Sequence, residues 1–473
     1  MTATGVDLFF APAVELAAWI RTGQLSPVEL MRATLERIDA VNPQLNAFVS
    51  MRPAEQLLAE AQAIAERLAH GDTVGALAGL PLGVKDLEDA VGLPTTHGSL
   101  LFKDVYPRRD TIQVERLKRA GAIVIGKTNT PEFGYTAFTT NRVYGTTRNP
   151  WNSERTPGGS SGGSGAAVAS GMVALATASD GGGSVRIPAA YNGLVGLKPT
   201  NGRIPWGPEE VLRCSATIVS GPLTRSVRDA ALWLDVTVGP HPADPFSLPH
   251  PGYSYQELLE RPLPPLRIAY NPTLGYARLE TQVRREVETA LRALEDAGHR
   301  IEEVDHNLTD VVIDWVRLMA SEDFGVLAPR LTDESLLDPG YLPGLSLGQQ
   351  TTPADLGQIQ RVRLQLVLEL EQLFSKFDLL ATPTVPTVAF AAEGPIPMEI
   401  EGKPVETAGG GIAFTYPFNF SGNPAISLRA GLTDAQLPVG LQLVAPRLRE
   451  ALLLQVARQY EQLRPWQHQW PRL

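Results

Sequence analysis

Residues 157–200 of the chain read PGGSSGGSGAAVASGMVALATASDGGGSVRIPAAYNGLVGLKPT. Two clusters of glycine and serine flank Ala166–Ala178, whose small side chains let a helix or a buried strand pack close to other backbone. A flexible glycine-serine linker has a similar composition. Here, however, the segment is interleaved with apolar residues, has no charged spacer and runs on into Arg186-Ile-Pro188. It therefore predicts a part of the core.

The regions on either side of this segment alternate between strand-like and helix-like patterns. Short apolar runs are bounded by turns rich in glycine and proline, and two longer stretches, 279–297 and 358–374, have helical spacing. The strand-like runs are Ala122–Ile125, Gly171–Ala176, Leu266–Tyr270, Leu379–Ala381, Ala425–Arg429 and Gly440–Val444. Strands that alternate with helices favour a layered α/β fold.

The first 70 residues are expected to be helical. Ser26-Pro27-Val28-Glu29 is typical of a helix start, with serine at the N-cap, proline at the first helical position and glutamate closing a capping box. Asn42-Pro43 predicts the end of that helix, because the residue before a proline disfavours helical geometry. A second helix is expected from about Pro53 to Ala69.

Composition excludes several classes of protein. The chain has 473 residues, a net charge of −10 and a single cysteine, Cys214, which we expect to be a small buried apolar residue. One cysteine forms neither an internal disulfide nor a cysteine-based metal site, which fits a cytoplasmic protein. The apolar stretch Leu8–Ile20 is too short to span a membrane and lacks the flanks of a signal peptide. An acidic chain without a basic run gives no reason to expect a nucleic-acid partner.

Two motif matches do not survive a physical reading. Residues 121–128 fit the phosphate-loop pattern, but the residues between its two glycines are Ala, Ile, Val and Ile, which favour a buried strand. Residues 158–162 fit the G-x-S-x-G elbow of esterases, yet a polar loop precedes them where the elbow needs a strand. None of the seven histidines lies in a motif, and only His97 is placed near the candidate site. No paired-histidine spacing supports a metal site, and no cofactor is expected.

The second glycine cluster offers chemistry for acyl transfer. Asp180-Gly-Gly-Gly-Ser184 presents the N–H groups of Gly181, Gly182 and Gly183 directly before a serine, which is what a nucleophile with an adjacent oxyanion hole needs. A serine needs a base, and without a motif histidine the remaining candidate is lysine. Lys85 lies in the apolar run Leu80-Pro-Leu-Gly-Val-Lys85, where burial would lower its pKa and make the neutral amine available.

These segments resemble the amidase signature family, which includes bacterial amidases, nylon-oligomer hydrolases and urethane-cleaving amidases. The resemblance spans nearly the whole chain, with its markers in order. They are GVKD around Lys85, GKTNTPEF at 126–133, PGGSSGG at 157–163, DGGGSVRIPA at 180–189, GLKPT at 196–200, GPLTRSVRDAA at 221–231 and LPVGLQ at 437–442. The resemblance implies an α/β fold with a large mixed twisted β-sheet covered by helices on both faces.

The resemblance also implies roles for individual residues. Ser184 is expected to form the acyl-enzyme, Lys85 to act as the base, and Ser160, after a cis peptide at Gly159–Ser160, to relay the proton between them. The N–H groups of residues 181–184 are expected to bind the oxyanion. Gly134 is expected to contact substrate through its carbonyl, with Tyr135 as its neighbour in the pocket. Residues that we expect to support the site without doing chemistry are Asp180, Arg186, Ser161 and Ser164.

The expected organisation is one domain over residues 1–473. It has a helical region at 1–75, a core at 80–235, and variable excursions at 239–265 and 307–411 that shape the pocket. The acyl pocket is expected to be lined by Trp206–Leu212, by the 307–357 stretch and by Gly409–Tyr416, which carry few charges.

The expected function is hydrolysis of small to medium apolar or aryl amides, extending to anilides, carbamates and esters, by a monomer or homodimer. One alternative is the glutamine-hydrolysing component of a tRNA-dependent amidotransferase. As we align them, those components carry an acidic residue before the late F-T-x-P-x-N stretch, whereas here Gly411-Ile-Ala413 precedes Phe414. The other alternative is a non-catalytic binding protein on the same fold, which three intact catalytic positions disfavour.

Overall fold

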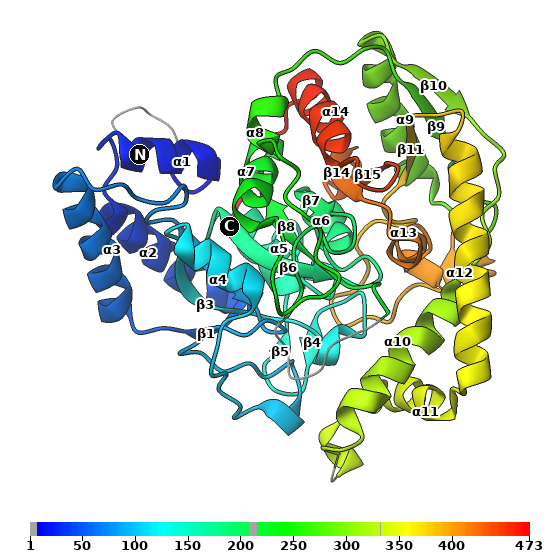
Figure 1. Cartoon of the computed structure of the whole chain (residues 1–473), viewed down its shortest axis with the longest axis horizontal. Helices are drawn as coiled ribbons and strands as arrows, with labels where there is room; N and C mark the ends of the chain where they lie inside the picture. Colours follow the sequence, from blue (N-terminus) through cyan, green and yellow to red (C-terminus); the bar gives the residue numbers. More distant parts are fainter. Residues whose placement is uncertain (1–6, 208–214, 332, 408) are drawn as a thin grey trace.

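The computed structural model describes residues 7–207, 215–331, 333–407 and 409–473. A single mixed sheet of eleven strands runs through the molecule (Figure 1). In spatial order its strands are β1 (Phe48–Met51), β3 (Ile123–Thr128), β2 (Pro81–Lys85), β6 (Leu175–Asp180), β8 (Val219–Thr224), β7 (Val195–Lys198), β14 (Ala425–Leu432), β15 (Pro438–Val444), β11 (Leu379–Pro383), β9 (Arg267–Tyr270) and β10 (Arg300–Glu303).

Both faces of this sheet are covered by helices. Neighbouring residues of a strand point to opposite faces, so Leu379 packs into one apolar cluster and Leu380 into another. The helices on the first face are α1 (Ala13–Arg21), α4 (Ile112–Arg119), α7 (Val227–Thr237), α9 (Thr281–Asp296) and α14 (Glu450–Leu463). Those on the second face are α2 (Pro27–Leu45), α3 (Ala54–Ala69) and α5 (Gly162–Ala169), then α12 (Pro353–Phe374) and α13 (Tyr416–Ser421). This arrangement confirms the expected α/β fold class.

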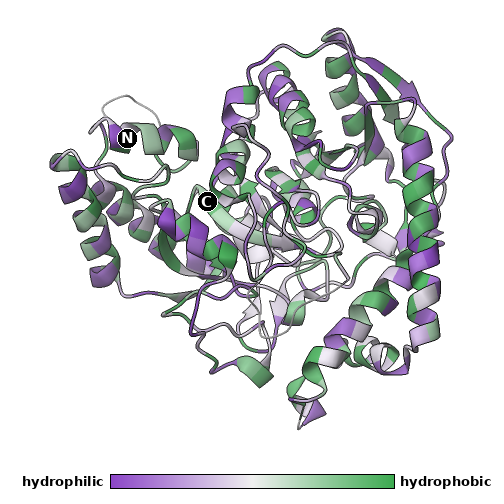
Figure 2. Ribbon diagram, viewed as in Figure 1, coloured by the Kyte–Doolittle hydropathy of each residue, from purple (hydrophilic) through white to green (hydrophobic). Residues whose placement is uncertain are grey.

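The outlying helices are amphipathic. Figure 2 shows polar and apolar residues alternating around α2, α3 and α12 at the edges of the molecule. Among the described helices, none has the length and apolar character needed to cross a lipid bilayer.

The strands expected from short apolar runs are present, with shifts at their ends. The run at 122–125 became β3, which confirms that the phosphate-loop match is a buried strand. Expected strand 171–176 begins later, at Leu175, because residues 170–173 form the turn after α5. Strand β1, which pairs with β3 at the edge of the sheet, was not expected inside the helical N-terminal region.

One helix end was predicted wrongly. Helix α2 does not stop at Asn42-Pro43 but continues to Leu45 with Pro43 inside it. The side chain of Asn42 accepts hydrogen bonds from the backbone N–H groups of Ala47 and Phe48, which fastens the chain just beyond the helix. The helix ends instead at Asn46, whose φ of 52° is left-handed.

The weakly patterned 307–357 stretch is largely helical. It contains α10 (Val312–Leu327), the 3-10 turn Glu334–Leu336 and α11 (Leu342–Gln350), and α10 and α11 lie side by side in Figure 1. The 239–265 segment contains one short helix, α8 (Tyr255–Leu258). Cys214 and positions 208–212 of the expected pocket wall lie outside the described residues.

Candidate active site

Lys85 is the last residue of strand β2 and is completely buried. Its amine donates hydrogen bonds to the hydroxyl oxygens of Ser160 at 2.8 Å and Ser179 at 3.1 Å. Burial lowers the pKa of Lys85 from 10.5 to about 7, against the opposing attraction of Glu88 and Asp180. A large share of the amine is therefore neutral at pH 7, with a lone pair able to accept a proton.

Ser160 lies on the loop before α5 and is 2% exposed. The peptide bond between Gly159 and Ser160 is cis, as the resemblance implied. The hydroxyl of the neighbouring Ser161 instead donates a long hydrogen bond of 3.4 Å to the carbonyl of Ser179. The structure thus separates two neighbouring serines that composition could not distinguish. Ser164 donates to the carbonyl of Thr177 at 2.8 Å, the supporting contact that was expected of it.

Ser179 is a site residue that the sequence reasoning missed. It is buried at the penultimate position of β6, and its hydroxyl is the second acceptor of the Lys85 amine. The sequence signal is slight: Ser179 is one of three polar residues in the buried strand β6 and lies five positions before Ser184.

Ser184 occupies the turn that joins β6 to the short helix α6 (Arg186–Asn192). This strand-turn-helix setting is the context that an exposed nucleophile needs and that residues 158–162 lack. Ser184 is partly exposed, whereas Lys85 and Ser160 are buried. Within the described part of the chain, Ser184 forms no hydrogen bond with Ser160, so the structure joins Lys85 to Ser160 but not Ser160 to Ser184.

The glycine turn before Ser184 corrects one expectation. The N–H of Gly183 donates to the carboxylate of Asp180 at 2.7 Å, so it is not available to bind an oxyanion. For the N–H groups of Gly181, Gly182 and Ser184 we find no acceptor among the described residues. These three N–H groups are the donors that the turn offers to a ligand.

Asp180 and Arg186 form a completely buried ion pair with an N–O distance of 2.9 Å. Burial alone would raise the pKa of Asp180, but the Arg186 guanidinium and the hydrogen bonds to the carboxylate lower it to about 2. Arg186 also donates to the carbonyl of Thr415 and to the side chains of Gln442 and Asn419. The pair therefore ties the glycine turn to the late part of the chain, as a supporting role requires.

Gly134 lies against the proposed relay serine. A Cβ placed on Gly134 would stand 2.9 Å from the Ser160 hydroxyl, and the φ of Gly134, +76°, favours glycine. The next residue, Tyr135, donates a hydrogen bond to Asp338 at 3.1 Å and meets the ring of Tyr341 edge-on. Tyr135 thus links this loop to the segment between α10 and α11.

His97, the histidine that the sequence placed near the candidate site, lies in an aromatic group. The ring of His97 packs against Phe102 and Phe133, with centroid distances of 5.3 Å and 6.3 Å. Among the described residues, no group of three or more histidine, cysteine, aspartate or glutamate side chains is arranged to hold a metal ion.

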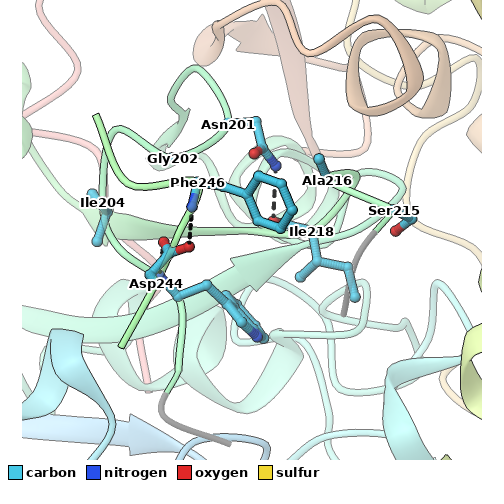
Figure 3. Close-up of a pocket in the computed structure, with 9 residues that line it drawn as sticks. Asn201, Gly202, Ile204, Ser215, Ala216, Ile218, Asp244 and Phe246 are labelled. Atoms are coloured by element: carbon cyan, nitrogen blue, oxygen red, sulfur yellow. Dashed lines mark hydrogen bonds between the residues drawn. The ribbon is translucent and has the colours of Figure 1, made fainter. Parts of the chain in front are cut away.

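A cavity adjoins the glycine turn on the side of Ile218, whose side chain lies 3.1 Å from a Cβ placed on Gly181 (Figure 3). The phenyl ring of Phe246 points across the cavity, while Asp244 lies at its edge and accepts hydrogen bonds from the backbone of Trp206 and Phe246. The described residues that line it are Asn201, Gly202, Ile204, Trp206, Ser215, Ala216, Ile218, Asp244 and Phe246.

Two of the three segments that were expected to line the pocket come close to the glycine turn. From the 307–357 stretch, the indole of Trp315 lies 2.3 Å and the methyl of Met319 lies 3.6 Å from Cβ atoms placed on Gly182 and Gly181. From the Gly409–Tyr416 stretch, the Thr415 hydroxyl lies 2.3 Å from a Cβ placed on Gly183.

Comparison with known proteins identifies the family. The family model described as Amidase matches residues 29–454. The chain is 37% identical to an acylamidase of Rhodococcus erythropolis, over 99% of this chain and 98% of that one. It is 35% identical to the A component of the glutamyl-tRNA(Gln) amidotransferase of Moorella thermoacetica, over 99% of both chains.

Solved structures agree. A bacterial aryl acylamidase of the amidase signature family superposes with a TM-score of 0.90 at 27% identity, over 97% of both chains. A 6-aminohexanoate cyclic dimer hydrolase with bound substrate gives 0.89 at 31% identity, over 99% of both. The chain therefore belongs to the amidase signature family and is an amide-hydrolysing enzyme.

Proposed function

We propose that this enzyme hydrolyses small to medium apolar or aryl amides through an acyl-enzyme on Ser184, with Ser160 as relay and Lys85 as base. The observation that carries the proposal is the contact between Lys85 and Ser160. A buried amine with a pKa of about 7 lies 2.8 Å from a serine hydroxyl, so it accepts a proton near neutral pH.

The reaction proceeds in two halves. Ser184 Oγ attacks the amide carbon while its proton passes to Ser160 and the proton of Ser160 passes to Lys85. The negative charge that forms on the carbonyl oxygen is stabilised by backbone N–H groups of the glycine turn. Collapse breaks the C–N bond, and Lys85 returns its proton through Ser160 to the leaving nitrogen. Water, activated along the same route, then releases the acid and restores Ser184.

The substrate class is supported by the surroundings of the turn and by relatives. Trp315, Met319 and Ile218, which lie against the glycines, are aromatic or aliphatic and suit an apolar acyl or aryl group. An acylamidase and an aryl acylamidase are among the similar proteins. Anilides, carbamates and esters share the reacting carbonyl, so we extend the proposal to them.

The glutamine-hydrolysing component of an amidotransferase is the second candidate, because the protein from Moorella thermoacetica is almost as similar as the acylamidase. The residues before Phe414 disfavour it. A Cβ placed on Gly410 would lie 2.7 Å from the sulfur of Met398, and one placed on Gly411 would lie 3.1 Å from the side chain of Ile396. The side chains that pack against these two glycines are therefore apolar. An ammonium group such as that of glutamine finds no carboxylate at positions 411–413.

Hydrolysis of a p-nitroanilide by the purified chain alone separates these two candidates. We expect turnover of acyl p-nitroanilides, none of glutamine, and loss of turnover in Ser184→Ala with the fold retained. Activity on glutamine alone that depends on an added partner would replace the proposal by the amidotransferase function. A panel of amides, carbamates and esters with mass-spectrometric detection of products then ranks the substrates.

The remaining proposals concern the setting of the enzyme. We propose that it acts in the cytoplasm on small molecules, without nucleic acid or membrane partners, as a monomer or homodimer. The single cysteine and the net charge of −10 support this setting.

A further inference from the structure

Two side chains from distant parts of the chain hold consecutive carbonyl groups of the glycine turn. The indole N–H of Trp315, near the start of α10, donates to the carbonyl of Gly181 at 2.8 Å. The hydroxyl of Thr415, just before α13, donates to the carbonyl of Gly182 at 2.6 Å. Both residues lie in segments that the sequence assigned only to the pocket wall, outside the motifs that contain Lys85, Ser160 and Ser184.

Holding a carbonyl also fixes the N–H of the next residue. A trans peptide unit is planar, and its C=O and N–H point in opposite directions. With the Gly181 carbonyl on Trp315, the N–H of Gly182 therefore points away from the indole. In the next unit Thr415 holds the Gly182 carbonyl, and the N–H of Gly183 reaches Asp180 on the other side.

The following unit is held by helix α6. The N–H of Ile187 donates to the carbonyl of Gly183 at 2.7 Å, so the N–H of Ser184 points away from the helix. Two N–H groups in these units have no acceptor among the described residues, those of Gly182 and Ser184. The direction of each is set by the hydrogen bond that the carbonyl of the same peptide unit accepts. Of these contacts, only the one with Trp315 fixes Gly182.

The side chains of Trp315 and Thr415 pack closely against the glycine turn. A Cβ on Gly182 would lie 2.3 Å from the Trp315 ring, and one on Gly183 would lie 2.3 Å from the Thr415 hydroxyl. The Trp315 ring is also stacked on Tyr416, with centroids 5.6 Å apart and planes 17° apart. Tyr416 in turn donates to Asp310 at 2.7 Å.

We propose that Trp315 and Thr415 are positioning residues of the oxyanion hole, and that Trp315 sets the direction of the Gly182 N–H. This role differs from packing, because it stabilises the transition state more than the bound substrate. In the transition state the carbonyl oxygen of the substrate becomes negatively charged. This inference rests on the proposed function, since it presumes that Ser184 is the nucleophile beside this turn.

The first test removes the indole N–H of Trp315 and keeps an aromatic ring at that position. Trp315→Phe is expected to lower kcat about tenfold, less than the 10²–10³ lost with a whole oxyanion donor, and to change KM less than about threefold. Trp466→Phe is the matched control, because the Trp466 indole also donates to a backbone carbonyl, that of Arg225 at 3.0 Å, far from the turn. The control should lose comparable thermal stability and keep its kcat.

Thr415 provides a rescue experiment. Thr415→Val keeps the shape of the side chain but loses the hydroxyl, whereas Thr415→Ser keeps the hydroxyl. We expect kcat to fall in the valine variant and to return to within about threefold of wild type in the serine variant. Equal losses in both variants would mean that Thr415 acts by packing, and would overturn its positioning role.

A pair of inhibitors gives the readout that packing alone does not move. An acyl trifluoromethyl ketone, which becomes a charged tetrahedral adduct, should bind Trp315→Phe about tenfold more weakly, in step with kcat/KM. A product carboxylic acid of the same acyl group should bind almost unchanged, and the pH profile should not shift. If both ligands weaken equally, Trp315 serves substrate binding and the inference fails. If Ser184→Ala keeps activity, the proposed function itself fails.

Discussion

The amine of Lys85 lies 2.8 Å from the hydroxyl of Ser160, and both groups are buried, whereas Ser184 is partly exposed. The contact joins the two residues that we propose as base and relay. Of the three proposed catalytic residues only Ser184 is partly exposed, and burial shields the Lys85 amine from water, which would otherwise keep its pKa near 10.4.

The pH dependence of the rate should report this base. Burial lowers the pKa of Lys85 to about 7, and only the neutral amine accepts a proton, so kcat/KM should fall about tenfold per pH unit below that value. Lys198 is a matched control, because it is also buried with a pKa lowered to about 7 but donates only to the carbonyl of Pro199. The Lys198→Met variant should keep the fall in kcat/KM at low pH. If that fall disappears in this variant, it reports Lys198 and not Lys85.

The stability of the protein should carry the same signature. Lys85 has a lower pKa in the folded chain than in the unfolded chain, so between about pH 7 and pH 10 the unfolded state binds more protons and the free energy of unfolding rises with pH. Lys85→Met removes this term. The stability of the variant relative to wild type should therefore be greatest at pH 7 and shrink by pH 9.5, as measured by urea unfolding. A pH-independent difference would show that Lys85 is charged in the folded protein.

Two adjacent serines should differ sharply on replacement. Ser160→Ala breaks the contact with Lys85, and we expect kcat to fall by about 10³, as for a lost proton-transfer group. Ser161→Ala loses only a hydrogen bond of 3.4 Å and should stay within about fivefold of wild type. Steady-state kinetics on one anilide decides the matter, and equal losses at the two positions would refute the relay.

Breaking the buried ion pair should cost stability as well as activity. Arg186→Met leaves the Asp180 carboxylate buried without its cation, which is expected to lower the free energy of unfolding by about 3–5 kcal/mol. Chemical denaturation measures this loss. The matched replacement Arg285→Met, at an exposed position on α9, should cost far less, because solvent screens its ion pair. Similar costs for the two variants would show that the pair does not hold the turn.

The turn itself should not tolerate a methyl group. The Cβ of Gly182→Ala would meet the Trp315 ring at 2.3 Å, so either the indole or the peptide must shift, and we expect at least a hundredfold loss of kcat. Gly325→Ala, in α10, meets nothing within 4 Å and should keep its activity. A fully active Gly182→Ala would argue against a rigid oxyanion hole.

Local sequence was sufficient for much of the fold. Apolar runs between turn residues located the strands, because period and turn chemistry act over a few residues. The predicted end of α2 was wrong. Pro43 was expected to end the helix, but the helix continues past it, and the Asn42 side chain binds the backbone just beyond the helix. The helices α10 and α11 were missed because their pattern is weak and packing against each other stabilises them.

The site divides in the same way. Ser184 and Lys85 were proposed from residue chemistry as well as from the resemblance, and Ser160 was proposed from the resemblance alone. Ser179 was overlooked, and Trp315 and Thr415 were expected only as members of long pocket segments, because their individual contacts depend on strands and helices that meet only in the folded chain. The engagement of the Gly183 N–H by Asp180 is likewise a property of the folded turn.

The central claim is that Ser184 carries the acyl group, and the mass of the trapped intermediate tests it most directly. Incubation with an activated aryl ester, followed by acid quench and peptide mapping, should show one acyl group on the peptide that contains residues 180–186. The same adduct should be absent from Ser184→Ala. An acyl group on Ser160 or Ser179, or turnover by Ser184→Ala, would contradict the account.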